Sequence, residues 1–174
     1  KDGGIAATDG STITTADNTD TLTLISTDAD ATVGPNLNFY RNSGSPADND
    51  DLGKIVFNGR NDNSQDVVYA QIRSTIVDAS DGTEDGLVKH DVSLGGTAYQ
   101  HLSMGNGSIV FNEESQDIDF RVESNGNTHM LFVDGGNNRV GVGTAPDLGV
   151  GLHIKTADSG ASNVANADEL VIEG

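Results

Sequence analysis

Apolar and polar residues alternate in short runs along most of the chain, the pattern of strands with one dry and one solvated face. The clearest run is Asp117–Glu123, in which every even position is apolar and every odd position is charged. Val and Ile outnumber Leu 25 to 11, which also favours strands. Further strands are expected at Thr21–Leu24, Leu37–Phe39, Ile55–Phe57, Val68–Ile76, Val88–Leu94 and Ile109–Phe111.

Turn-forming residues separate these runs. Asn58-Gly59, Asn106-Gly107 and Asn125-Gly126 accommodate positive φ at little cost and are expected to be turns. Leu131–Val133 and Arg139–Gly143 flank an Asp-Gly-Gly-Asn-Asn segment and predict a hairpin. Gly141 and Gly143 alternate with valines in its second strand, so one face of that strand has no side chains, and another backbone is expected to approach it closely.

The fold class predicted from these patterns is all-β with little or no helix, since no window offers a convincing helical stripe. A short helical turn is expected only within residues 161–170.

The composition predicts a thin core or one that is shared between chains. Leu, Ile, Val and Phe make up 41 of 174 residues, about 24%, just above the roughly 20% below which highly charged chains are usually disordered.

There is no Cys, which excludes disulfides, thiolate metal sites and Cys nucleophiles. A net charge of −18 argues against nucleic-acid binding, and no apolar run is long enough for membrane insertion.

An internal near-repeat suggests a modular chain. Ile13–Asp17 and Ile154–Asp158 match as I-x-T-A-D, and Asn18–Leu24 and Asn166–Ile172 match as N-x-D-x-L-x-[LI]. We therefore expect a segment of a longer, linear protein whose next module begins near the C-terminus. Its predicted parts are an entry segment at 1–20, β modules at 21–104 and 105–155, and the start of a further module at 156–174.

Candidate sites for chemistry are weakly marked. The 27 acidic residues single out no catalytic pair, and Asp78–Gly86 has the oxygen-rich composition of a Ca²⁺ loop without EF-hand spacing. The four histidines are scattered and the few tyrosines make a weak carbohydrate platform. We therefore expect no catalytic residue, no metal ligand and no cofactor. The histidines are His90, His101, His129 and His153, and the tyrosines are Tyr40, Tyr69 and Tyr99.

Several longer stretches of the chain carry a resemblance to a known family. They are Leu37–Tyr40, Asp51–Asp62, Val68–Ile72, Asp78–Val88, Ile109–Glu113, Asp117–Asn125 and Met130–Thr144. Together they resemble repeat modules of tailed-bacteriophage fibre proteins, especially fibres and tailspikes of phages infecting aquatic bacteria. The resemblance runs from about Leu22 to Ile172 and departs from the family in lacking an H-x-H tip motif.

This resemblance implies an elongated, intertwined homotrimer that forms the shaft or stalk of a virion appendage and supports attachment to the host surface. Its partners would be two further copies of itself, other virion proteins, and a glycan or protein of the host surface. It would be assembled in the host cytoplasm and located in the virion. A capsid-decorating head fibre or adhesin domain, and a tailspike-type polysaccharide depolymerase, are the alternatives.

Overall fold

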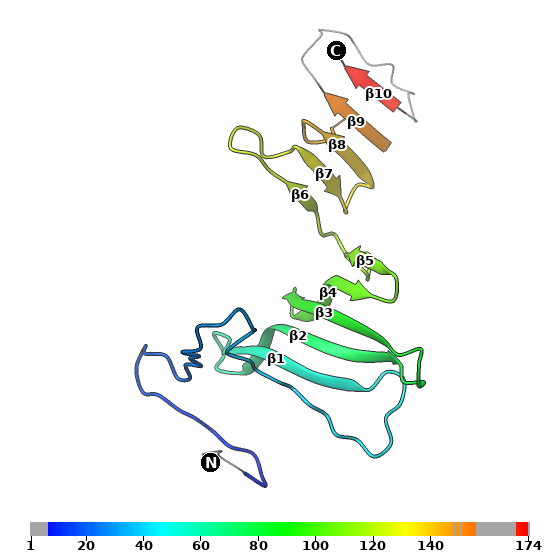
Figure 1. Ribbon diagram of the computed structural model, residues 1–174. Coiled ribbons are helices and arrows are strands. Elements are labelled where there is room, and N and C mark those ends of the chain that lie inside the picture. Colours follow the sequence, from blue (N-terminus) through cyan, green and yellow to red (C-terminus); the bar gives the residue numbers. More distant parts are fainter. Residues whose placement is uncertain (1–6, 148, 150, 156–169, 174) are drawn as a thin grey trace. The chain divides into compact units, whose positions relative to one another are not determined.

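The computed structural model describes residues 7–147, 149, 151–155 and 170–173 (Figure 1). The chain divides into two compact units, Lys1–Phe39 and Tyr40–Gly174. The described residues contain ten strands and no helix, so the predicted all-β class is confirmed. The predicted helical turn lies outside the described residues except for Leu170, which is in a strand. The module boundaries that the repeat suggests remain predictions.

The described part of the first unit, 7–39, contains no strand, so the strands predicted at Thr21–Leu24 and Leu37–Phe39 are wrong. Alternation alone does not make a strand, because the backbone needs a neighbouring strand to hydrogen-bond with. Here local turns are present instead. The Asp17 carboxylate accepts a bond from the Thr19 N–H (3.0 Å), and that of Asp30 accepts one from the Thr32 N–H (2.7 Å).

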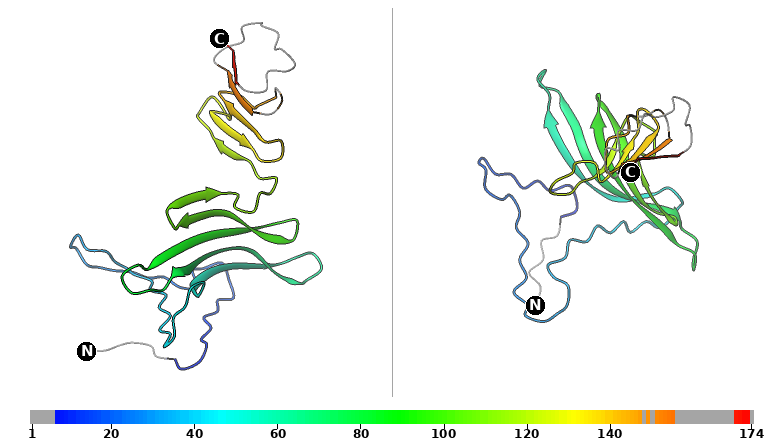
Figure 2. Two further views of the ribbon diagram at one scale, coloured as in Figure 1. Left: turned by 90° about the vertical axis from the view of Figure 1, so that its right-hand side faces the viewer. Right: turned by 90° about the horizontal axis from the view of Figure 1, so that it is seen from above.

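The second unit begins with a five-stranded antiparallel sheet in which each strand pairs with the next along the chain. Three long strands are followed by two shorter ones (Figure 1), and both views in Figure 2 show the twist of the long strands. The strand predictions that fall here are confirmed. The strands are β1 (Asp51–Arg60), β2 (Asp66–Asp78), β3 (Asp85–Leu94), β4 (Thr97–Gly105) and β5 (Ser108–Phe111).

The turns of this sheet correct one sequence prediction. Asn106-Gly107 forms the β4–β5 turn with φ values of 49° and 75°, as expected. Asn58-Gly59 is not a turn, because it lies inside β1 beside a register shift between Phe57 and Asn58. The chain reverses at 61–65 instead, where the Asn61 side chain accepts bonds from the backbone N–H groups of Asn63 and Gln65.

A second sheet follows, with the strand order β6-β7-β8-β9-β10. Pairing is antiparallel from β6 to β8 and parallel from β8 to β10. The predicted hairpin is confirmed as β7 and β8. The strand predicted at Asp117–Glu123 is shortened to β6, because only Phe120–Val122 pair with β7. Just before it, the Asp119 carboxylate accepts a hydrogen bond from the Gly135 N–H (3.1 Å) in the hairpin loop. The strands are β6 (Phe120–Val122), β7 (Leu131–Asp134), β8 (Arg139–Val142), β9 (Gly151–Lys155) and β10 (Leu170–Glu173).

Two glycine predictions fall in the second sheet. A Cβ on Gly141 would lie 2.3 Å from the Thr144 carbonyl oxygen, so the expected close approach is confirmed there, and the approaching backbone is the chain's own loop. The turn predicted at Asn125-Gly126 is present, because the Ser124 N–H donates across it to the Asn127 carbonyl oxygen (2.8 Å), but neither residue has the expected positive φ. The Asn127 side chain also shapes this turn, since its Nδ2 donates to the Gly143 carbonyl oxygen (2.9 Å).

Very little apolar surface is buried within the chain. Among the described residues the only buried hydrophobic side chain is Phe132 of β7, at 9% exposure. Its ring packs edge-on against His129, with 5.0 Å between the ring centroids.

Candidate functional surface

The first sheet presents an apolar face to solvent. Cross-strand pairing joins Ile55, Ile72, His90, Leu102 and Phe111 in one row over all five strands, and paired residues point to the same side. The apolar face, as the term is used below, consists of this row together with the same-side residues Phe57, Ala70, Val88, Val92, Tyr99, Met104 and Ile109.

Much of the apolar face is open to water in the single chain. Ile55 is 43% exposed, Phe57 is 54% exposed and Ile109 is 66% exposed. Val92, Met104 and Phe111 are exposed as well. Full burial of such a side chain contributes about 1.5–3 kcal/mol each, so leaving them in water forgoes a large stabilisation.

The opposite face of the same sheet, called the polar face below, contains the side chains that are buried. Lys54, Arg73, Lys89 and Ser103 form one row, and Val56, Gln71, Asp91 and Gln100 form the next. The four buried polar residues of the described chain, Thr75, Asp91, Gln100 and Ser103, all lie on this face.

Asp91 is the centre of a polar network on this face and is 5% exposed. Its Oδ2 accepts hydrogen bonds from Gln71 Nε2 (2.8 Å) and Arg73 Nε (2.9 Å). Arg73 Nη1 also lies 3.8 Å from Asp51 Oδ1, which accepts a bond from the Thr75 hydroxyl (2.7 Å). These bonds compensate the cost of removing the groups from water, so the polar face is held together by groups of the chain itself. Asp91 Oδ1 is buried without a partner.

A hollow of about 340 Å³ opens on the apolar face. One wall is a pair of aromatic rings, Phe111 of β5 and Phe120 of β6, whose centroids are 4.7 Å apart. Two predicted candidates, His90 and His101, meet here, and His101 Nε2 is buried without a partner. The hollow is lined by His90, Val92, His101, Leu102, Phe111, Asn112, Ile118, Asp119 and Phe120.

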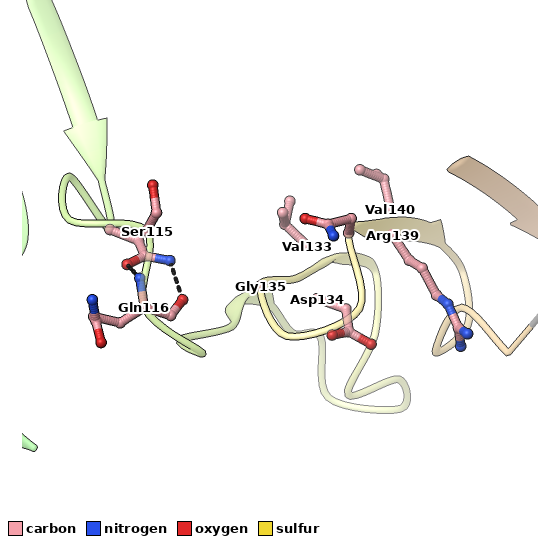
Figure 3. A pocket seen from close by; sticks show the side chains of 9 residues that line it. Ser115, Gln116, Val133, Asp134, Gly135, Arg139 and Val140 are labelled. Atoms are coloured by element: carbon pink, nitrogen blue, oxygen red, sulfur yellow. Dashed lines mark hydrogen bonds between the residues drawn. The ribbon is translucent and has the colours of Figure 1, made fainter. Parts of the chain in front are cut away.

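A second, more polar hollow of about 270 Å³ lies between the segment after β5 and the β7–β8 hairpin (Figure 3). The Asn112 side chain bonds the backbone N–H and carbonyl of Gln116 on one side of it. Figure 3 shows the Arg139 side chain pointing away from Ser115 and Gln116, and its Nη1 donates to the Pro146 carbonyl oxygen (3.3 Å). The hollow therefore does not present its arginine as an anion site.

The acidic loop at Asp78–Gly86 uses carboxylates for turn formation. The Asp78 carboxylate accepts a bond from the Ser80 N–H (2.8 Å), and its pKa is lowered by the hydrogen bonds from Ser80 and Thr83. Nowhere in the described part of the chain do three His, Asp or Glu side chains gather in a way that could hold a metal ion.

The remaining sequence candidates are not brought together. His129 packs on Phe132, and His153 lies in β9. Tyr69 is the unpaired residue at the register shift between β1 and β2, and its ring lies against Gly59, whereas Tyr99 of β4 pairs with Val92 of β3. Neither aromatic pair found among the described residues includes a tyrosine, so no stacked tyrosine platform for a sugar is seen there.

Sequence reasoning missed the Asp91 network. The alternation of Gln71 and Arg73 with apolar neighbours in β2, and of Lys89 and Asp91 in β3, was the available signal. It marks a polar face on each strand, but the pairing of the two strands was needed to place Asp91 beside Arg73.

Comparison with known proteins identifies no family, since neither a family model nor a curated protein matches the chain. Within the described residues no helix is long and apolar enough to cross a membrane.

Proposed function

We propose that the chain is a structural component of a tailed-bacteriophage virion appendage, a fibre shaft or stalk in which three identical chains share one core. The observation that carries the proposal is that many large apolar side chains of the first sheet are exposed, while Phe132 is the only large apolar side chain that is buried among the described residues. A chain of this kind gains most of its burial from neighbouring copies.

The chain exposes more surface than a compact protein of its size. A compact monomer of 18.0 kDa would expose about 8,000 Å². The chain exposes 13152 Å². The described residues 7–39, all of which are exposed, contribute to this excess together with the apolar face. Closing sheets around a symmetry axis would also cover strand edges such as those of β1 and β5.

The two hollows favour a structural role over polysaccharide cleavage. Glycoside hydrolysis uses two carboxyl groups about 5–10 Å apart on either side of the scissile bond. The hollow on the apolar face has one carboxylate in its lining, Asp119, and the polar hollow has one, Asp134. Asp134 is further engaged by the Asn137 N–H (2.8 Å) in its own turn.

Immunogold electron microscopy of virus particles, with antibodies against the first sheet, tests the proposal. We expect gold along a tail-associated fibre, at positions between its base and its tip. Gold on the capsid would contradict the tail assignment and favour a head fibre. Release of reducing ends from host polysaccharide by the purified protein would contradict the structural role and favour a depolymerase.

A further inference from the structure

The polarity of the first sheet is unusual for a single chain, because many of its large apolar side chains are exposed and its buried side chains are all polar. We propose that the apolar face of β1–β5 is the surface on which copies of this chain meet, and that a second copy covers it. This inference rests on the proposed function, in which identical chains share a core, and it adds which face of which sheet points inward.

The distribution of charge supports a second copy of the chain as the partner that covers the apolar face. Each chain has a net charge of −18, so two copies repel one another wherever their carboxylates meet. The apolar face, as defined above, contains no Asp, Glu, Lys or Arg. The hollow on this face is lined by one carboxylate, Asp119, which accepts a hydrogen bond from the Gly135 N–H of its own chain. Apart from Asp119, the apolar face is therefore a surface at which two acidic chains can approach without bringing like charges together or desolvating them.

Several polar groups of the polar face are already bonded within their own chain. Arg73 and Gln71 are bonded to Asp91, and Thr75 is bonded to Asp51. Covering this face would also desolvate the exposed Lys54. Consequently the polar face belongs on the outside of the assembly, where its lysines remain hydrated.

The hollow beside Phe111 and Phe120 gives the apolar face a socket. Four of its lining side chains, Val92, Leu102, Phe111 and Phe120, offer apolar contacts to an inserted group. An apolar side chain of the second copy would fill it, and close packing of that kind is typical of obligate interfaces.

Single cysteines test this assignment, since the chain has none of its own. Ile55 and Lys54 are adjacent in β1, lie on opposite faces, and are both exposed in the single chain. A thiol at Ile55→Cys and one at Lys54→Cys therefore differ in access only if something covers one face. We expect maleimide to modify the native Ile55→Cys protein at least about tenfold more slowly than the Lys54→Cys protein, with equal rates in denaturant.

Met104→Cys repeats the test on β4 in case Ile55→Cys does not assemble. Oxidation of the apolar-face variants is expected to link chains of 18.0 kDa into larger species. Equal labelling of both faces in the native protein, or protection of Lys54→Cys alone, would overturn the inference. A protected Ile55→Cys thiol in a protein that sediments as a monomer would overturn the choice of a second copy.

Failure of the proposed function gives a different result. Protection of the apolar-face thiols in a protein that is absent from virus particles would leave the interface standing and refute the fibre role. Gold-labelled fibres with freely reactive apolar-face thiols would keep the fibre role and refute the assignment of this face.

Discussion

Asp91 stabilises the polar face of the first sheet because its Oδ2 accepts bonds from both Gln71 and Arg73. Replacing it with alanine leaves the Gln71 amide and the Arg73 guanidinium without that acceptor. We expect Asp91→Ala to lower the free energy of unfolding by about 1–3 kcal/mol. Thermal unfolding measures this as a lower midpoint temperature.

Asp66→Ala is the matched control, because it removes a carboxylate from an ion pair with Arg60 that is largely exposed on both sides. Such pairs contribute about 0–1 kcal/mol. A loss in Asp91→Ala no larger than that in Asp66→Ala would contradict the structural role of the network.

Gly105 ends β4 with a φ of 148°, and a Cβ there would lie 2.2 Å from the Gly86 carbonyl oxygen of β3. Gly105→Ala therefore forces β3 and β4 apart, and we expect it to lower the yield of folded protein or the unfolding temperature. Gly126→Ala is the control, since its Cβ would meet nothing within 4 Å. Equal stability of the two variants would show that the strand ends have room to move.

The turn of the β7–β8 hairpin makes a prediction about pH. The Asn137 side chain lowers the pKa of Asp134, and the Arg139 charge lowers it further. A carboxyl whose pKa is lower in the folded state contributes stability above its unfolded pKa, and this contribution is lost as the pH falls through the folded value. We expect an NMR titration of Asp134 to give a midpoint below that of an ordinary aspartate, and Asn137→Ala to raise it. An unchanged midpoint in Asn137→Ala would contradict this cause.

At the scale of elements, alternation located strands well where a neighbouring strand follows along the chain. Ile55–Phe57, Val68–Ile76, Val88–Leu94 and Ile109–Phe111 each lie in a strand of one meander. Thr21–Leu24 alternates equally well but has no strand beside it in the described chain. Asn58-Gly59 was wrongly predicted as a turn, because both residues continue β1 paired with Val68 and Val67 and neither has positive φ. The local sequence indicates which side chains of a strand would share a face, whereas the pairing of strands depends on residues that are distant in the sequence.

A prediction at the scale of elements concerns the junction between the two sheets. Phe120 of β6 packs on Phe111 of β5 at the hollow of the apolar face. Phe120→Asp would place a carboxylate in a surface that assembly dries, at a cost of several kcal/mol or forced protonation. We expect loss of the assembled species in sedimentation velocity. Arg121→Gln changes the adjacent, exposed side chain and should assemble normally. Normal assembly of Phe120→Asp would show that β6 faces the other way.

For the whole molecule, the composition predicted a thin or shared core, and the structure shows where the apolar side chains that are not buried within the chain lie. The sequence marks the apolar positions of each strand, but not that five of these strands align them into one face opposite a polar network. That arrangement follows from register, for which Ile55, Ile72, His90, Leu102 and Phe111 must pair in turn. The candidate surface could not be predicted from the sequence because no short motif carries it.

The mass of the purified, folded chain tests the central claim most directly. Multi-angle light scattering after size exclusion, with circular dichroism to confirm strands, measures it without reference to the virus. We expect a single species at three times the chain mass of 18.0 kDa. A folded, monodisperse species of 18.0 kDa, with its apolar face open to water, would contradict a core shared between copies.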